Sequence, residues 1–382
     1  MKILIIAPNF ISNDSVASLR MKSLYNFLKN AGHTVFVLTG FSESEHKREK
    51  DLYYVKTIEG KGSSVYTYYV FKQNSVYYEE KFKKIVKKDR PEIVLISGGP
   101  FYTFGIANLS KKYNIPCILD FRDPWVFDVR GIRDLISLKR LSTRLVQVPY
   151  ERSAVNAASA VVTVTNGWKT KFQKYYPFCK NKFHLIENGY DDFLLNERYF
   201  RDRENKNTNL VLGIFGKLFY YTPKYSKIFI SAISELKNDL SILHIGTRES
   251  CAEKYLLEFG VDSSLICDTG FIPYADGMNQ LSESDVLVII DIRKDAMGTK
   301  IYDYIWMNKP ILYIGPSNTE LALFINKFEN GFVCSNKKEI IQAVEKIKSF
   351  KIKHLDMNVD TKKYARSCHN KEWERLLKKF VI

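Results

Sequence analysis

Two aspartates near the C-terminal end of the chain have the spacing of a ligand-binding pair. Asp295 and Asp303 lie eight positions apart, in a segment that reads DAMGTKIYD. On a helix this spacing is just over two turns, so both carboxylates are expected on one face. Carboxylates at this spacing bind ligand hydroxyl groups, and they are also common on the solvated face of a helix.

A glycine and two polar residues lie between the aspartates, where the helix would begin. Gly298 is followed directly by Thr299 and Lys300. A loop that leads into a helix presents free backbone N–H groups and the positive end of the helix dipole, and both attract phosphate. Together with the carboxylates, the segment predicts a ligand that carries hydroxyl and phosphate groups. A nucleotide sugar has both.

The pattern of strands and helices along the chain predicts two domains. Apolar strand-like runs alternate with helical patterns over residues 1–190, and a second alternating set fills 210–361. The polar stretch 191–209 predicts a linker, and 362–382 predicts a final helix. Continuous β-branched runs separated by helices indicate parallel sheets covered on both faces. The expected strands are 3–6, 34–38, 93–96, 115–119, 160–164, 210–214, 242–245, 265–266, 286–290, 311–314 and 331–333.

Composition and charge narrow the class of protein. The chain has 382 residues, 45% of them hydrophobic, and a net charge of +16. The length suffices for two domains with separate cores, and the hydrophobic content is typical of a soluble globular protein. No motif for nucleic-acid binding accompanies the positive charge. We therefore expect acidic substrates or an anionic membrane surface as partners, and no nucleic acid.

The cysteines and the apolar runs indicate in which cellular compartment the protein is expected. Six scattered cysteines form no C-x-x-C pair, which argues for a reducing cytoplasm and against a structural zinc. Residues 2–8 predict a first strand that is too short for a signal peptide, and no run approaches a membrane span. Basic amphipathic patterns occupy 81–88 and 125–152. They predict peripheral association with the inner face of the cytoplasmic membrane, or else core helices with a solvated basic face.

The DAMGTKIYD segment resembles the donor-binding motif E-x7-E of glycosyltransferase family 4. Asp295 and Asp303 stand at the two glutamates, Gly298 at a glycine and Pro310 at the proline of the continuing pattern, without a gap. Both glutamates are shortened by one methylene. The version KIYDY at 300–304 also resembles a branch of the family that has Lys-x-x-Glu-Tyr in this segment.

Shorter segments carry the resemblance along the chain. Residues 31–35 resemble a Gly-His-x-Val motif that enters the second strand, and 186–191 resemble an Asn-Gly-x-Asp motif that closes the first domain. Gly216 and Lys217 stand where the family has Gly-Arg, and Lys224 stands at the lysine of its Lys-Gly pair.

Two other segments match less closely or differ. Gly270 and Phe271 lie in a turn that resembles the border of the family's base pocket. Arg122 and Asp123 stand near the position of a histidine in many members, and they either contact a substrate or close a loop by a salt bridge. The family's N-terminal glycine-rich loop is missing, and Arg20 is the charged residue that we expect to act there.

The resemblance implies a fold and a set of roles. The fold is GT-B, an α/β architecture of two Rossmann-like parallel-sheet domains that face a cleft, with the last helix crossing back to the N-terminal domain. The nucleotide-binding set is Gly216, Lys217, Lys224, Gly270, Phe271, Gly298, Thr299, Lys300 and Asp303. Asp303 would bind the ribose hydroxyls, and the two lysines 217 and 224 the diphosphate. The catalytic set is Asp295, Arg122 and Asp123, with Asp295 on the hydroxyls of the donor sugar.

The resemblance also implies an activity. We expect a retaining glycosyltransferase that moves a sugar from a nucleotide sugar, UDP-linked by preference, to a lipid-linked or growing glycan acceptor in bacterial surface polysaccharide synthesis. No Asp-x-Asp pair occurs, so we expect neither a divalent metal nor another cofactor. Two alternatives remain open: a nucleotide-sugar epimerase with the same fold, and a catalytically silent sugar-nucleotide-binding subunit of a glycan assembly complex.

Overall fold

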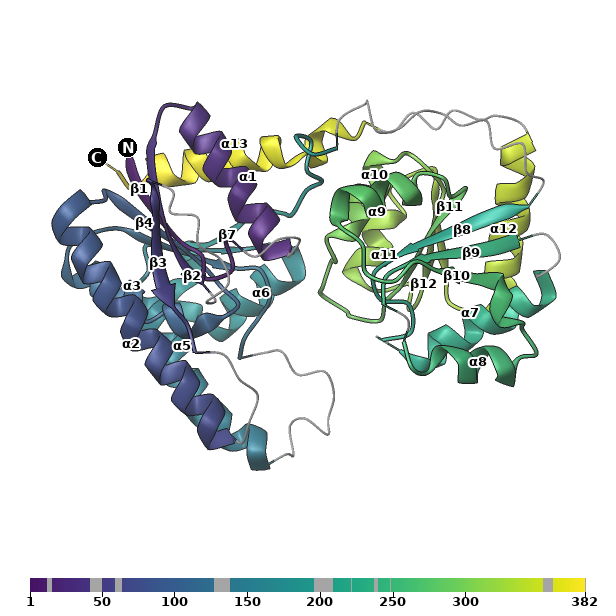
Figure 1. The fold of residues 1–382 in the computed structure, drawn as a ribbon, viewed down its shortest axis with the longest axis horizontal. Coiled ribbons are helices and arrows are strands. Elements are labelled where there is room, and N and C mark those ends of the chain that lie inside the picture. Colours follow the sequence, from purple (N-terminus) through teal and green to yellow (C-terminus); the bar gives the residue numbers. More distant parts are fainter. Residues whose placement is uncertain are drawn as a thin grey trace. The chain divides into compact units, whose positions relative to one another are not determined.

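In the computed structural model the chain forms two compact units, which Figure 1 shows as ribbons. Unit 1 comprises Met1–Asn188 and Arg366–Ile382, and unit 2 comprises Gly189–Ala365. Most of the predicted linker lies outside the described part of the chain. The structure describes residues 1–11, 16–41, 50–58, 64–126, 138–195, 209–220, 222–236, 240–247, 249–352 and 360–381.

Unit 1 is built on a seven-stranded sheet whose strands pair in parallel, in the order β3-β2-β1-β4-β5-β6-β7. The central strands are buried over nearly their whole length, since helices cover both faces. The strands are β1 Lys2–Ile6, β2 Thr34–Phe41, β3 Leu52–Lys56, β4 Ile93–Ser97, β5 Cys117–Phe121, β6 Ala160–Thr163 and β7 Phe183–Leu185. Strands β3 and β7 were not predicted.

The helices of unit 1 include the last helix of the chain. Trp373 of α13 packs with Met21 and Leu24 of α1 in one buried cluster on the sheet, and Asn370 Nδ2 donates to Ser23 Oγ at 3.0 Å. Figure 1 shows α1 and α13 close together. The helices are α1 Val16–Asn30, α2 Ser64–Asp89, α3 Ile106–Lys112, α5 Leu138–Ala157, α6 Asn166–Tyr175 and α13 Arg366–Lys378, with the short turns η1 Phe101–Thr103 and η2 Pro177–Lys182.

A buried arginine on α1 connects several strand ends of unit 1. Arg20 donates from Nε and Nη2 to the Asp120 carboxylate on β5, at 3.3 and 3.4 Å. Nη1 donates to Glu187 O and to Asn188 Oδ1, and Nη2 also donates to Ile186 O. All five N–H groups of the guanidinium therefore have acceptors inside unit 1, at the point where the chain leaves it.

This arrangement gives Arg20 a structural role instead of the ligand contact that the sequence suggested. We expected Arg20 to contact a ligand, but its side chain is almost completely buried, and its donors are committed to unit 1. On its other side the guanidinium lies 5.6 Å from the centre of the Trp373 ring. The residue therefore links α1, β5 and α13, and it holds the segment that leads from β7 to Gly189.

Unit 2 is built on a six-stranded parallel sheet in the order β10-β9-β8-β11-β12-β13. Alternate residues of β11 enter different clusters: Val286, Val288 and Ile290 belong to one, Leu287 and Ile289 to the other. This alternation puts one apolar cluster on each face of the sheet. The strands are β8 Leu210–Phe215, β9 Leu240–Ile245, β10 Ile266–Asp268, β11 Val286–Ile290, β12 Ile311–Ile314 and β13 Gly331–Cys334.

The helices of unit 2 follow the strands in turn, as expected for a doubly wound sheet. Five of the six strands were predicted from their apolar runs, and the prediction for β10 overlaps that strand only at Ile266. Because the strands are parallel, their carboxyl ends meet at one edge, where open α/β sheets bind ligands. The helices are α7 Pro223–Leu236, α8 Ala252–Glu258, α9 Tyr274–Leu281, α10 Lys300–Trp306, α11 Glu320–Ile325 and α12 Lys337–Ile352, with the turns η5 Ser263–Leu265 and η6 Lys362–Tyr364.

The Arg20 network generates a stability prediction. Replacing Arg20 with alanine leaves the Asp120 carboxylate buried without its cation, which costs about 3–5 kcal/mol. Arg20→Lys keeps the charge with fewer donors and should lose less. The urea midpoint is measured by tryptophan fluorescence, since Trp125, Trp168 and Trp373 all lie in unit 1.

The matched control for this prediction is an exposed arginine on α13. Arg375→Ala should change stability by less than about 0.5 kcal/mol, as surface substitutions usually do. Equal midpoints for Arg20→Ala and Arg375→Ala would contradict the role assigned to Arg20.

Candidate functional site

The two aspartates of the DAMGTKIYD segment do not lie on one helix. Helix α10 begins only at Lys300, so Asp303 is in its first turn and Asp295 lies in the loop before it. The predicted shared helix face is therefore wrong. Asp295 is half-buried and Asp303 is buried, so the two carboxylates also differ in their access to solvent.

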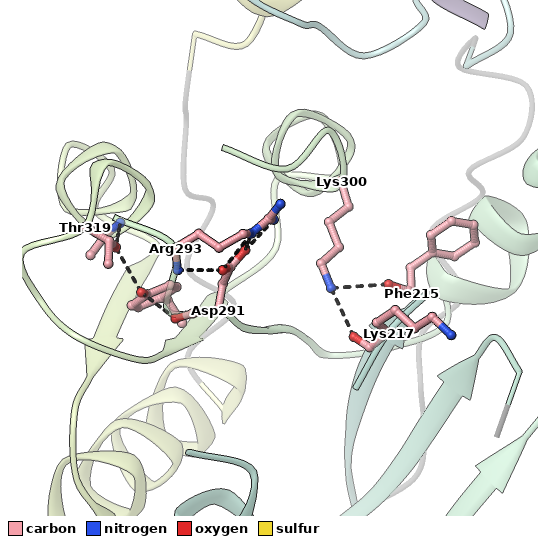
Figure 2. A network of polar contacts seen from close by, with 8 residues as sticks. Phe215, Lys217, Asp291, Arg293, Lys300 and Thr319 are labelled. Carbon is pink, nitrogen blue, oxygen red and sulfur yellow. Dashed lines mark hydrogen bonds and ion pairs between the residues drawn. The ribbon is translucent and has the colours of Figure 1, made fainter. Parts of the chain in front are cut away.

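A salt bridge that the sequence patterns did not reveal holds the loop between β11 and α10 (Figure 2). Arg293 Nη2 lies 2.6 Å from Asp291 Oδ2, and Nε donates to both carboxylate oxygens at 3.0 and 3.1 Å. The backbone N–H of Arg293 donates to Asp291 Oδ1 at 2.9 Å. This side-chain-to-backbone bond is an alternative to helical hydrogen bonding, and it explains why no helix starts here.

A second set of bonds fixes the same loop from β12. The Tyr313 hydroxyl donates to Asp291 O at 2.8 Å and lies 2.9 Å from Thr319 Oγ1. The Glu320 N–H donates to Lys294 O at 2.8 Å. The loop that carries Asp295 is therefore held at both its start and its middle.

Asp303 faces a tyrosine from the neighbouring helix α9. The Tyr274 hydroxyl donates to Asp303 Oδ1 at 2.6 Å, a short bond typical of a charged acceptor. The Tyr274 ring meets Phe215, the last residue of β8, edge to face. Next to Asp303, the Tyr304 hydroxyl accepts from the Phe215 N–H at 3.0 Å. Helix α10 is thus anchored to the end of β8.

Lys300 connects the start of α10 to the loop after β8. Its Nζ donates to Phe215 O at 3.3 Å and to Lys217 O at 3.5 Å, as Figure 2 shows. Burial of the ammonium lowers the pKa of Lys300 to about 8, and the Asp291 carboxylate opposes this shift. Lys300 therefore changes its charge close to neutral pH, and its two bonds are long enough to be exchanged for stronger ones.

A histidine on β9 holds the backbone of the β8 loop. His244 Nε2 lies 2.7 Å from Gly216 O, which can only accept, so this nitrogen donates. Nδ1 lies 2.6 Å from Asp268 Oδ1, at the end of β10. Gly216 has a φ of +81°, which favours glycine. A Cβ on Gly246 would lie 2.7 Å from Gly216 O, so close packing requires glycine at 246, whereas the backbone conformation favours it at 216.

The predicted diphosphate lysines differ in their surroundings. Lys217 lies directly after Gly216, with its Nζ 5.6 Å from the centre of the Tyr220 ring. Lys224 is exposed in the first turn of α7, with its Nζ 5.4 Å from the Tyr225 ring. Lys227, a competitor for the second position, forms an ion pair with Glu258. Between Lys224 and Lys227, the exposed Lys224 is therefore the better candidate for the diphosphate, because Glu258 already neutralises Lys227.

A carboxylate holds the segment that follows Lys217. Glu249 Oε2 accepts from the Leu218 N–H at 3.1 Å and from the Phe219 N–H. Its other oxygen, Oε1, is buried without a hydrogen-bond partner in the described residues. This carboxylate comes from the loop after β9, so the β8 and β9 loops are joined here.

The remaining predicted nucleotide contacts also lie at this edge of unit 2. Gly270 follows β10 and has a φ of +74°, and the next residue, Phe271, is 76% exposed. Gly298 and Thr299 are half-buried directly before α10, and a Cβ on Gly298 would lie 3.6 Å from Arg293 Nη2. An exposed phenylalanine ring beside a left-handed glycine is available for stacking on a flat ligand.

In unit 1, Arg122 and Asp123 follow β5 and point to different surroundings. Arg122 Nη2 donates to Gly98 O and, at 3.0 Å, to Gly99 O, while Nε is buried without a partner in the described residues. Burial lowers the pKa of Arg122, and Asp120 and Asp123 oppose the shift. Asp123 is exposed. Arg122 thus clamps the loop after β4, and Asp123 is open to a ligand.

The tryptophan beside this pair is already stacked. Trp125 lies parallel to Phe101, with ring centres 5.0 Å apart, and against Phe71, with centres 5.7 Å apart. Its ring faces are therefore occupied by aromatic neighbours. It stiffens the β5 loop that carries Arg122 and Asp123.

Some of the site was missed from the sequence. Asp291 and Arg293 stand directly after an apolar strand, and charged residues at a strand's carboxyl end are a signal that was available. His244 sits inside an apolar strand before a glycine, a position that looks like core. Tyr274 and Glu249 had no sequence signal, because only the fold brings them to Asp303 and to the β8 loop.

The comparisons with known proteins agree with this fold. Residues 17–192 match the model of Glycosyltransferase Family 4. A glycosyltransferase from Rickettsia africae superposes with a TM-score of 0.63 at 16% identity, covering 99% of this chain and 98% of the other. The Anabaena protein Alr3699/HepE in complex with UDP and glucose superposes with a TM-score of 0.64 at 15% identity, covering 99% of each chain.

Solved structures that are named for a different activity share the fold as well. The UDP-GlcNAc 2-epimerase from Methanocaldococcus jannaschii superposes with a TM-score of 0.61 at 15% identity, covering 99% of this chain and all of the other. No curated protein matches the chain in sequence. Among the described helices, none has the length and apolarity needed to cross a membrane.

These findings decide the fold of the chain and the family that part of it resembles. Both units have the parallel sheets of the GT-B fold, as predicted, and the family model covers unit 1 from α1 to the end of β7, without β1 and α13. The chain therefore has the GT-B fold, and its residues 17–192 match Glycosyltransferase Family 4.

Proposed function

We propose that the chain is a retaining, metal-independent glycosyltransferase that takes a sugar from a UDP-linked donor. The acceptor is a lipid-linked or growing glycan in bacterial surface polysaccharide synthesis. The protein works on the inner face of the cytoplasmic membrane. The Anabaena structure with UDP and glucose supports a nucleotide-sugar donor for this fold.

One observation carries the proposal: Lys300 joins the β8 loop to the start of α10, beside Asp303. In this arrangement a cation, a glycine with left-handed backbone and a buried carboxylate all lie at the carboxyl edge of one sheet. A donor needs these groups, since its diphosphate requires positive charge and its ribose requires hydroxyl acceptors.

The phosphate groups are assigned to the lysines around the β8 loop. Lys300 exchanges its two long bonds to carbonyl oxygens for the diphosphate, and Lys217 and Lys224 contribute from the loop and from α7. Stabilising the departing diphosphate lowers the barrier because negative charge develops there in the transition state. Gly298 and Thr299 provide backbone N–H groups, and Gly216 and Gly298 leave space for the close approach, since no side chain projects from them.

The hydroxyl groups are assigned to the two aspartates. Asp303 accepts from the ribose hydroxyls with the carboxylate that Tyr274 orients. Asp295, in the braced loop before α10, accepts from the hydroxyls of the donor sugar. The base lies over Phe271 beside Gly270. Arg122 and Asp123 of unit 1 act on the reacting sugar or the acceptor, with Asp123 the exposed member.

Retention needs no side-chain nucleophile in this proposal. The acceptor attacks from the same face as the departing diphosphate, within an ion-pair-like transition state. The alternative, a nucleotide-sugar epimerase, is kept because a UDP-GlcNAc 2-epimerase has the same fold at a similar TM-score. Product analysis separates the two, since an epimerase changes the donor sugar without an acceptor.

The two aspartates generate the first functional prediction. Asp303→Ala should weaken UDP-glucose binding about ten- to a hundredfold, since hydrogen bonds to a charged group contribute roughly 1.5–3 kcal/mol. Asp295→Ala should leave the binding of UDP alone unchanged, because UDP lacks the sugar, and should lower kcat with UDP-glucose about tenfold or more for the same reason. Isothermal titration and steady-state kinetics measure the two effects.

Tyr274→Phe is the control, because it removes only the hydroxyl that orients Asp303 and leaves its charge. It should weaken binding less than Asp303→Ala does. Unchanged UDP-glucose affinity in a folded Asp303→Ala variant would remove the ribose assignment.

The pKa of Lys300 generates a pH prediction. The protonated ammonium binds the diphosphate, so donor affinity should be full below pH 8 and fall as pH rises through about 8. Arginine stays protonated throughout the range from pH 7 to pH 9, so Lys300→Arg should abolish the fall. Lys227→Arg, a control on α7, should keep it. The dissociation constant of UDP-glucose between pH 7 and pH 9 is the measurement, and an unchanged slope in Lys300→Arg would contradict the assignment.

The metal-independent mechanism has a simple test. Treatment with EDTA should leave the transfer rate unchanged, because lysines rather than a divalent ion balance the diphosphate. The rate of UDP release with and without added Mg²⁺ or Mn²⁺ is compared. A loss of activity that either metal restores would refute this part of the proposal.

A further inference from the structure

A cavity of about 550 Å³ lies between the end of β3 and helix α2 in unit 1. This volume is within the range of small-molecule sites, roughly 300–1,000 Å³. No role proposed for the donor or for Arg122 involves it. Its walls include two tyrosines, three lysines and one glutamate: Tyr54, Tyr77, Lys56, Lys81, Lys84 and Glu80.

The walls of the cavity are fixed by internal contacts. The buried Asn74 side chain of α2 accepts from the Ile58 N–H at 2.9 Å and donates to Ile58 O at 3.1 Å. The Tyr54 ring packs edge to face on Phe41, with ring centres 6.2 Å apart. The chain after β3 is therefore pinned to α2, and both sides of the cavity are held in place by contacts within unit 1.

The cavity lies at the carboxyl edge of the unit 1 sheet, as do the loops after β1, β4 and β5. Thr57, a wall residue, approaches Gly40 so closely that a Cβ there would lie 3.0 Å from Thr57 Cγ2 and 3.1 Å from Pro8 O. From the same loop, Asn9 Nδ2 donates to Gly99 O, which also accepts from Arg122. A continuous line of contacts within unit 1 thus connects the cavity to Arg122.

The chemistry of the walls selects a ligand class. Tyrosine rings stack on the apolar faces of sugar rings. Three lysines against one glutamate leave an excess of positive charge, which requires an anionic ligand. The Glu80 carboxylate can only accept hydrogen bonds, so it requires hydroxyl donors and disfavours a densely charged phosphate. A sugar chain that carries carboxylate groups meets all three conditions.

The basic segment of the same helix offers little apolar surface to a lipid. In the basic segment 81–88 of α2, the apolar residues Phe82, Ile85 and Val86 are buried in unit 1. This segment therefore forms a core helix with a solvated basic face, the second of the two interpretations of its sequence. The basic segment at 125–152 lies partly outside the described residues, 127–137 among them.

We propose that this cavity, which we call the β3–α2 cavity, binds an acidic oligosaccharide, the carboxylate-bearing stretch of the acceptor glycan. Only the identification of this oligosaccharide as the acceptor rests on the proposed transferase function. Binding of the acidic sugar chain itself follows from the walls of the cavity. Lys56 and Lys84 bind carboxylates, Tyr54 and Tyr77 stack on sugar rings, and Glu80 accepts from hydroxyls.

The experiment is a titration of the full-length protein with two matched probes. A tetrasaccharide of alternating glucuronic acid and N-acetylglucosamine is compared with the neutral tetramer of N-acetylglucosamine. The acidic probe should bind at least tenfold more tightly, and added salt should weaken it, since partly exposed charges are screened. Lys56→Glu with Lys84→Glu should weaken the acidic probe on the order of tenfold, from two lost ion pairs and added repulsion.

The control variant reverses the charge of two lysines on α2 that do not line the cavity. Lys83→Glu with Lys87→Glu makes the same change in net charge. It should alter affinity by less than the cavity variant does. Tyr77→Ala should also weaken the acidic probe while leaving all charges in place. UDP-glucose binding is measured on every variant and should not change, since the donor groups lie in unit 2.

Three outcomes would overturn the proposal. Equal loss in both double variants would mean diffuse attraction by net charge. Equal binding of the neutral probe would remove the acidic class. The third outcome is that the protein binds anionic phosphatidylglycerol vesicles, loses this binding only in the cavity variant, and does not bind the acidic probe. This surface would then be a membrane contact. Absent UDP-glucose binding in the unmodified protein would instead refute the donor site and leave the sugar site standing.

Discussion

The buried guanidinium of Arg20 is the constraint on which unit 1 depends. A charge removed from water is tolerated only when its partner and its hydrogen bonds are complete, and here all five N–H groups have acceptors. These bonds form only when α1, β5 and the segment after β7 are held at fixed positions relative to one another. The loop that presents Arg122 and Asp123 begins at the strand that Arg20 holds, so its starting point is set by an interaction that no substrate touches.

Unit 2 fixes its strand ends in a different way, with several partly neutral bonds instead of one buried ion pair. His244 holds Gly216, Glu249 holds the two N–H groups that follow Lys217, and Tyr313 holds Asp291. Each bond joins the ends of two neighbouring strands. Together they shape a row of loops at one edge of the sheet while leaving Lys300 with long bonds that a stronger acceptor can replace. Rigidity of the surroundings and an exchangeable central cation are both favourable for binding an anion.

The sequence was informative where burial dominates. Five strands of unit 2 and the central strands of unit 1 contain continuous apolar runs, and these were predicted, whereas the prediction for β10 reached only its first residue. Strand β3 was missed because its residues, LYYVK, are half-exposed at the edge of the sheet, and β7 was missed because it has three residues. The helix through Asp295 failed for another reason: spacing says nothing about the Asp291–Arg293 pair or the bonds from β12 that hold the segment as a loop. The family motif located the donor side, but Tyr274, His244 and Glu249 reach it only through the fold. The assigned roles of the motif residues stay predictions.

The position of α13 bears on how the protein is made. Trp373 and Leu377 fill part of the core of unit 1, yet α13 follows the whole of unit 2 in the chain. During synthesis the sheet of unit 1 therefore emerges long before the residues that close its apolar face and cover Arg20. Domains usually fold in order as they leave the ribosome, but this one stays incomplete until unit 2 has been translated. The nascent chain must carry an uncovered apolar face through that interval, which makes it a natural client for a chaperone.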